Sequence, residues 1–155
     1  METVQFEFPC LYFKIQTSKI QYGKSISALP QPTTTTPLTS LSSCNKSLLN
    51  LSRGNQPGNA LTMFLKLRME GLDVNRFSFP PLLKAAARIE GLFEGMQVHG
   101  LGAKLGFDSD PFVQTSLVGM YAACGRVDDA RLMFDKMSHR DVVTWSIMFD
   151  GYGNC

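Results

Sequence analysis

Apolar residues recur at helical spacing beyond about residue 43. The clearest case is a pair of stripes separated by Cys124 and Gly125, which predict a helix end. The stripes consist of Leu117, Val118, Met120 and Tyr121, and of Ala130, Met133, Phe134 and Met137. A pair of amphipathic helices leaves an apolar face uncovered, so we expect it to stack on a neighbouring pair.

The helix pair is repeated along the chain. Small residues recur every 35 positions, and bulkier ones follow four places later, at Ala60, Gly95 and Ala130 and at Phe64, His99 and Phe134. Small side chains are expected where two helices approach closely. After the second unit the spacing shortens to 31, which relates Tyr121 to Tyr152. The period predicts an all-α fold, an α-solenoid of stacked helix-turn-helix repeats.

The period also predicts the boundaries of the repeat units. These are 41–75, 76–110 and 111–141, followed by a partial unit, 142–155. The partial unit has room only for its first helix, from which we expect the sequence to be a fragment of a longer array. Ser78 and Thr144 stand near the start of the first helix in their units and are predicted to be N-caps.

Residues 1–43 are predicted to form a disordered leader, with the repeats occupying 44–155. The segment contains lysine but no arginine, and it ends in a run rich in threonine, serine and proline. Such a sequence cannot bury enough apolar surface to offset the entropy of ordering the chain. Its hydroxyl-rich and cationic composition favours an organelle transit peptide, more chloroplast-like than mitochondrial. A plain disordered tail stays open as the alternative.

Composition argues against several other classes of protein. The net charge of +2 is too small to indicate nucleic acid by itself. The four cysteines lack Cys-x-x-Cys spacing and have no histidine at metal-ligand spacing, so we expect reduced thiols rather than a metal site. No apolar run is long enough to cross a bilayer, and no membrane partner is expected.

The sequence contains no glycine-rich phosphate loop, no nucleophile elbow and no zinc-deaminase motif. His99 takes the place of a phenylalanine in the other units and is predicted to pack in the core, whereas His139 is predicted to lie at the surface. We therefore predict no catalytic residues, no metal, no cofactor and no enzyme activity.

Two full units and the beginning of a third are specific enough to indicate a family. They are RFSFPPLLKAAARIEGLFEGMQVHGLGAKLGFDSD, PFVQTSLVGMYAACGRVDDARLMFDKMSHRD and VVTWSIMFDGYG. From about Asn45 to its end the chain resembles the plant pentatricopeptide-repeat proteins of the PLS class, whose units alternate in length. Local departures are Asn55 and Glu90, where the family usually has glycine, and Ser47, where it usually has an apolar residue.

The resemblance implies sequence-specific binding of single-stranded RNA in a chloroplast or mitochondrion, with the chloroplast slightly favoured. Members of the family assist RNA editing, splicing, stability or translation, so editing or processing factors are implied as further partners. In the family the first helices line one groove, where each unit meets one base. The fifth and last residues of a unit contact the base edge, and the second residues of adjacent units sandwich the base.

Carried onto this sequence, the resemblance implies two reading pairs. Asn45 with Asn75 is associated with pyrimidines, usually cytosine, and Thr115 with Asp141 is associated with guanine. Pro80 with Asp110 fits no ordinary pair and is expected to act as a spacer. Ser146 begins a fourth reading position. The sandwiching positions are occupied by Ser42, Phe77, Phe112 and Val143.

Aromatic residues at helical spacing more often belong to a core, so burial of Phe77 and Phe112 stays open. Two other functions also stay open. One is a protein-interaction scaffold like the related tetratricopeptide repeats, and the other is a truncated product without independent function.

Overall fold

Helices account for most of residues 40–71 and 73–153, the part of the chain that the computed structural model describes. In order they are α1 (Leu41–Arg53), α2 (Gly58–Met69), the 3-10 helix η2 (Arg76–Ser78), α3 (Phe79–Arg88), α4 (Leu92–Lys104), α5 (Pro111–Ala123), α6 (Val127–Lys136) and α7 (Val142–Gly153). These ranges contain no β-strand. No helix within them is long and apolar enough to span a membrane.

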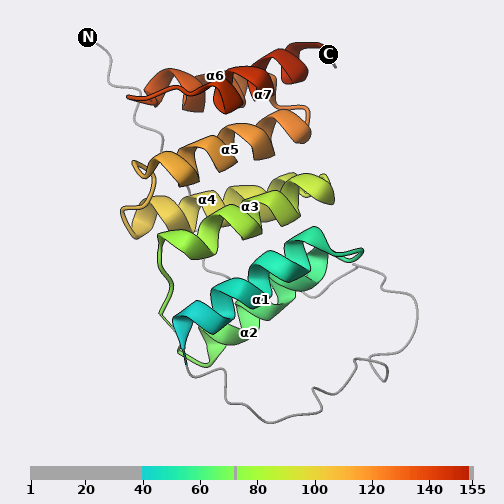
Figure 1. Cartoon of the computed structure of the whole chain (residues 1–155), viewed down its shortest axis with the longest axis vertical. Coiled ribbons are helices and arrows are strands. Elements are labelled where there is room, and N and C mark those ends of the chain that lie inside the picture. Colours follow the sequence, from blue (N-terminus) through green and yellow to red (C-terminus); the bar gives the residue numbers. More distant parts are fainter. Residues whose placement is uncertain (1–39, 72, 154–155) are drawn as a thin grey trace. The chain divides into compact units, whose positions relative to one another are not determined.

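The helices stack in two layers (Figure 1). The first helices of successive pairs, α1, α3, α5 and α7, pack against one another in turn and form one layer. The second helices, α2, α4 and α6, form the other layer, and each packs on α3, α5 or α7 of the following pair. The prediction of an all-α solenoid built from helix pairs is therefore confirmed.

Small residues lie where the two layers meet. Ala60 and Ala130 are fully buried, and Gly95 is buried against Met120 of α5. A Cβ atom on Gly95 would collide with the Met120 side chain, so the repeated small residue permits close contact between α4 and α5. The equivalent bulky residues Phe64 and Phe134 are also buried.

His99 packs less deeply than its phenylalanine equivalents. It is half-buried, and its Nδ1 lies 2.9 Å from the hydroxyl of Tyr121, with the two rings in edge contact. Burial lowers the pKa of His99 and raises the pKa of Tyr121 to about 12. The pair therefore stays uncharged around neutral pH and serves packing, as the sequence predicted for His99. His139 is exposed.

Glycines in the left-handed conformation follow three of the helices. Gly71, Gly106 and Gly125 have φ angles of 78°, 77° and 71°, after α2, α4 and α5. Gly125 confirms the helix end predicted from Cys124 and Gly125. After α3 the corresponding residue is Glu90, whose φ of 52° is unusual for a residue with a side chain.

The hydrogen bonds at the starts of η2 and α7 test the predicted N-caps Ser78 and Thr144. Asn75 caps η2, since its side-chain oxygen accepts the backbone N–H of Phe77, and Asp141 caps α7 by accepting the N–H of Thr144. Thr144 is therefore not the capping residue of α7, because Asp141 three places earlier takes that role. Ser78 does occupy the N-cap position of α3, but its side chain makes no capping bond to α3; its hydroxyl accepts the backbone N–H of Asn75 at 3.4 Å and completes a capping box at η2. Helix α1 begins at Leu41, so residues 41–43, predicted as the end of the disordered leader, are helical. Residues 1–39 of the predicted leader lie outside the described part of the chain.

Candidate nucleic-acid interface

The expected base-reading residues of the repeat units lie in the first layer of helices. Asn45, Thr115 and Ser146 occupy the early turns of α1, α5 and α7, and the first turns of these helices follow one edge of the stack (Figure 1). Asn75 and Asp141, the last residues of their units, lie immediately before η2 and α7. A side chain at the end of a unit thus lies near the first helix of its own unit.

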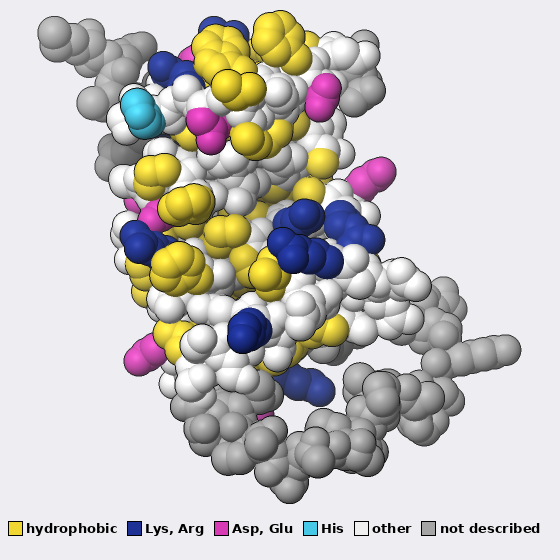
Figure 2. Space-filling view, in the orientation of Figure 1, with side chains coloured by type: hydrophobic (Ala, Val, Ile, Leu, Met, Phe, Trp, Pro, Cys, Tyr) yellow, Lys and Arg dark blue, Asp and Glu magenta, His cyan; other side chains and the backbone are white. Residues whose placement is uncertain are grey.

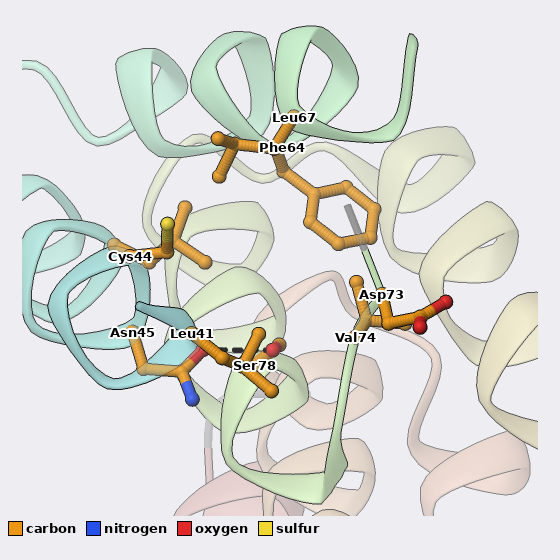
Figure 3. A pocket seen from close by; sticks show the side chains of 9 residues that line it. Leu41, Cys44, Asn45, Phe64, Leu67, Asp73, Val74 and Ser78 are labelled. Carbon is orange, nitrogen blue, oxygen red and sulfur yellow. Dashed lines mark hydrogen bonds between the residues drawn. The ribbon is translucent and has the colours of Figure 1, made fainter. Parts of the chain in front are cut away.

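The first reading pair is in direct contact. The amide nitrogen of Asn45 donates to the side-chain oxygen of Asn75 over 3.0 Å, across 30 residues of sequence. The hydroxyl of Ser78 donates to the side-chain oxygen of Asn45 over 2.8 Å. Figure 3 shows Asn45 and Ser78 facing each other at the edge of a small apolar pocket beside α1. Asn45 lines this pocket, which has only about 10 Å³ of internal space.

The second reading pair is joined through a third residue. The side-chain oxygen Oδ1 of Asp141 accepts both the N–H and the hydroxyl of Thr144, at 2.8 and 2.6 Å. The hydroxyl oxygen of Thr144 lies 3.4 Å from that of Thr115. Hydrogen bonds from the side chain and backbone of Thr144 lower the pKa of Asp141, so its carboxylate stays ionised at neutral pH.

The second unit has a different arrangement. Pro80 has no polar side chain, and the carboxylate of Asp110 is nine-tenths buried, with 11% exposure. One oxygen of Asp110 accepts the N–H groups of Phe112 and Val113 at 3.0 and 3.3 Å, and the other lies 3.4 Å from the guanidinium of Arg76. The protein itself therefore engages both oxygens.

The side chains expected to sandwich bases are at the surface. Phe77, Phe112 and Val143 are 55%, 67% and 58% exposed, and Ser42 is also exposed. The core alternative for the two phenylalanines is therefore wrong. The guanidinium of Arg76 lies over the ring of Phe77, 4.8 Å from its centre. Figure 2 shows hydrophobic side chains exposed on this face of the molecule, together with a group of Lys and Arg side chains.

Ser146, the fourth reading position, is exposed on α7. Its hydroxyl donates to the carbonyl of Val142 over 2.9 Å, which leaves the oxygen lone pairs available to a ligand.

Sequence reasoning missed three residues that shape this surface, namely Ser78, Thr144 and Arg76. Each of the two hydroxyl residues follows an asparagine or aspartate by three positions, at 75 and 78 and at 141 and 144. That spacing is a signal for side chains that meet at a helix start. The contact between Arg76 and Asp110 spans 34 residues, one repeat, so only the repeat register could have revealed it.

Outside this surface the described residues show little that suggests catalysis. No group of three or more His, Cys, Asp or Glu side chains in residues 40–71 and 73–153 could hold a metal ion. A cavity of about 180 Å³ is lined by polar side chains of α4, α5 and α6, among them His99, Gln114 and Lys136. Burial disfavours protonation of His99 there.

The fold defines a helical-repeat solenoid whose first helices form one continuous layer. Residues 115–142 match the family model of the PPR repeat, and this match includes both Thr115 and Asp141. The chain is similar to pentatricopeptide repeat-containing protein At4g14820 of Arabidopsis thaliana, with 45% identity over 108 residues, which are 70% of this chain and 15% of that protein.

Two further Arabidopsis thaliana relatives have names that include an organelle. Pentatricopeptide repeat-containing protein At3g26782, mitochondrial, is 36% identical over 74% of this chain, and At1g11290, chloroplastic, is 36% identical over 73%. The chain spans only 17% and 14% of their lengths. Together the comparisons support a pentatricopeptide repeat protein.

Proposed function

We propose that this chain is a PLS-class pentatricopeptide repeat protein that binds single-stranded RNA, with one base facing each unit. The observation that carries the proposal is the coupling of the fifth and last residues. In the first unit the two residues are joined by a hydrogen bond. In the third unit Thr144, whose hydroxyl donates to Asp141, lies 3.4 Å from Thr115. Both pairs stand beside exposed side chains that can stack on bases. A scaffold for peptides has no need to couple residues at these particular positions.

The third unit presents acceptors and therefore suits guanine. The hydroxyl proton of Thr115 is donated within the protein, to the carbonyl of Pro111 at 3.0 Å, so its oxygen faces outward as an acceptor. The second oxygen of the ionised Asp141 is an acceptor as well. Guanine has two adjacent N–H donors on its Watson–Crick edge, whereas adenine has a ring nitrogen acceptor that these oxygens would repel.

The first unit presents mainly donors and suits a pyrimidine. The oxygen of Asn75 is taken by Asn45 and by the N–H of Phe77, which leaves the amide nitrogen of Asn75 as a donor. Asn45 adds one N–H and one lone pair. The nitrogen of Asn45 is on the side of Asn75, so the groups offered to a base follow in the order Asn75 N–H (donor), Asn45 N–H (donor) and Asn45 oxygen (acceptor). Cytosine presents the complementary order, acceptor, acceptor, donor.

The second unit is a spacer in this proposal. Pro80 offers no hydrogen bond, and Asp110 is engaged by two backbone N–H groups and by Arg76. The preferred RNA therefore contains a pyrimidine and a guanine separated by one unselected nucleotide.

Stacking on Phe77, Phe112 and Val143 supplies affinity without selecting a base. Stacking on an aromatic side chain contributes about 1 to 3 kcal/mol per base. The Lys and Arg side chains on the same face can contact phosphates, which adds salt-dependent affinity (Figure 2).

The proposed setting is a chloroplast or mitochondrion, as in the names of the two relatives quoted above. There the chain would select a transcript for processing or modification, such as C-to-U editing, and other proteins would supply the chemistry.

The test is selection of single-stranded RNA from a random pool by the full chain, followed by binding measurements on the enriched sequence. Asp141→Asn replaces an acceptor with an amide of the same shape, and we expect it to lower the preference for guanine over adenine about tenfold. Asp135→Asn is the matched control, because Asp135 lies on α6 and pairs with Arg131. No enriched sequence, or an unchanged preference in Asp141→Asn, would reject the proposal.

A further inference from the structure

We infer that Ser78 and Thr144 are positioning residues for base selection, each acting on the reading pair of the preceding unit. This inference rests on the proposed RNA-binding function. Both are the third residue of their unit, both are buried, with 1% and 0% exposure, and neither can touch a base directly. They act through their hydroxyl groups, which fix which atoms of the reading pair face outward.

In the first pair, the direction of every hydrogen bond follows from one backbone group. The N–H of Phe77 can only donate, so the atom of Asn75 that it meets must be the oxygen. That oxygen in turn requires the nitrogen of Asn45 as its other partner. The oxygen of Asn45 is then left facing Ser78, whose hydroxyl donates to it at 2.8 Å. Ser78 thus closes the chain that holds the amide of Asn45 in one orientation.

The orientation of that amide distinguishes the two pyrimidines. In the observed orientation the groups of Asn75 and Asn45 that a base would meet are donor, donor and acceptor, which is complementary to the edge of cytosine. A half-turn of the Asn45 amide would change this order to donor, acceptor and donor, which is complementary to the edge of uracil. The amide torsion has two broad minima, so the hydrogen bonds at either end decide between them. Loss of the Ser78 hydroxyl removes one of these two hydrogen bonds.

In the second pair, Thr144 fixes the carboxylate. Its hydroxyl and its N–H both donate to Oδ1 of Asp141, at 2.6 and 2.8 Å, and these two bonds set the orientation of the exposed carboxylate. The oxygen of Thr144 also lies 3.4 Å from that of Thr115. The third-position hydroxyl therefore donates to Asp141 and packs beside Thr115, the two members of the pair proposed to select guanine.

The spacer unit provides an internal comparison. At the third position after Pro80 and Asp110 stands Val113, which has no hydroxyl and is also buried, with 1% exposure. The carboxylate of Asp110 accepts backbone N–H groups, as Asn75 and Asp141 do, but its other oxygen lies beside Arg76 and no side-chain hydroxyl of the described residues binds it. A hydroxyl thus stands three residues after the last residue of each polar reading pair, at Ser78 and Thr144, and is absent three residues after Asp110. Val113 also shows that the stack accepts valine at this position.

The experiment uses the full chain and RNAs that differ only at the two selected nucleotides. Ser78→Ala should lower the preference for cytosine over uracil about fivefold and leave guanine selection unchanged. Thr144→Val should lower the preference for guanine over adenine by a similar factor and leave cytosine selection unchanged. Ser78→Thr and Thr144→Ser retain the hydroxyl and should retain both preferences. A merely structural role would instead weaken binding of all RNAs equally.

A second measurement separates this inference from the proposed function. The side-chain amide resonances of Asn45, assigned with Asn45→Asp, should shift and exchange faster in Ser78→Ala than in Ser78→Thr, with no RNA present. An unchanged amide signal, or unchanged base preferences in both hydroxyl deletions, overturns the positioning role. A wild-type chain that binds RNA without base preference overturns the proposed reading function, whatever the amide shows.

Discussion

The guanidinium of Arg88 donates a hydrogen bond of 2.6 Å to the backbone carbonyl of Ser52, which joins the end of α3 to the end of α1. The same nitrogen, Nη1, also lies 2.7 Å from the carbonyl of Gly54. Carbonyl groups in the last turn of a helix have no partner within the helix and must be satisfied from outside. One arginine of the second unit therefore completes the helix end of the first unit.

Loss of this contact should destabilise the junction between the first two units. We expect Arg88→Ala to lower the free energy of unfolding by about 1 to 3 kcal/mol, because hydrogen bonds from a charged donor are lost and carbonyls are left unsatisfied. Arg88→Lys should recover part of the loss, since an ammonium group retains the charge without the planar fork. Urea unfolding followed by circular dichroism measures the change. Arg53→Ala, an exposed arginine in the last turn of α1, should have little effect and serves as the control.

Gly95 should be intolerant of even one added carbon. Its Cβ would collide with Met120, which is 1% exposed and has little room to move. We expect Gly95→Ala to destabilise the chain by about 1 to 2 kcal/mol, despite the better helix propensity of alanine. Gly100→Ala on the same helix meets nothing within 4 Å and should be neutral or stabilising. Equal effects of the two substitutions in thermal unfolding would disprove the close contact between α4 and α5.

Much of this fold could be predicted because its determinants repeat. The spacing of Ala60, Gly95 and Ala130 gave the close contacts between helices, and Gly125 gave a helix end. The helix-start network could not be predicted in the same way. Ser78 was interpreted as an N-cap because hydroxyl residues favour that position. Its hydroxyl also donates to Asn45, which is 33 residues away, and only the packing of α1 on α3 brings these two together.

Glu90 should be a position where a substitution stabilises the chain. Its φ of 52° places a side chain in the left-handed region, which costs about 1 to 2 kcal/mol. Glycine removes this strain but adds about 0.4 to 1 kcal/mol of unfolded-state entropy, so Glu90→Gly should gain about 0.5 to 1 kcal/mol. The same change at Glu94, in the first turn of α4, should be destabilising. Loss of stability in Glu90→Gly, measured by urea unfolding, would contradict the assigned backbone conformation.

The last prediction converts the spacer unit into a reading unit. Pro80→Thr places the same residue type at the fifth position as in the third unit, and Arg76→Ala releases one oxygen of Asp110. The double variant then presents a hydroxyl and a carboxylate oxygen, the two kinds of acceptor that are proposed to select guanine. We expect it to prefer guanine at the middle nucleotide several-fold, whereas the wild-type chain accepts any base there. Binding to four RNAs that differ only at this nucleotide measures the effect.

The two single variants separate the contributions. Pro80→Thr alone should gain less, because Arg76 still neutralises the carboxylate of Asp110 at 3.4 Å. Arg76→Ala alone should gain nothing, since proline offers no hydrogen bond, and it should weaken binding of all four RNAs because it removes a cation beside Phe77. A double variant that binds the four RNAs equally would show that the spacer is silent for another reason. The absence of a third-position hydroxyl at Val113 is then the next cause to test, by Val113→Thr in the same background. A hydroxyl there would donate to the freed carboxylate and orient it, as the hydroxyl of Thr144 donates to Asp141.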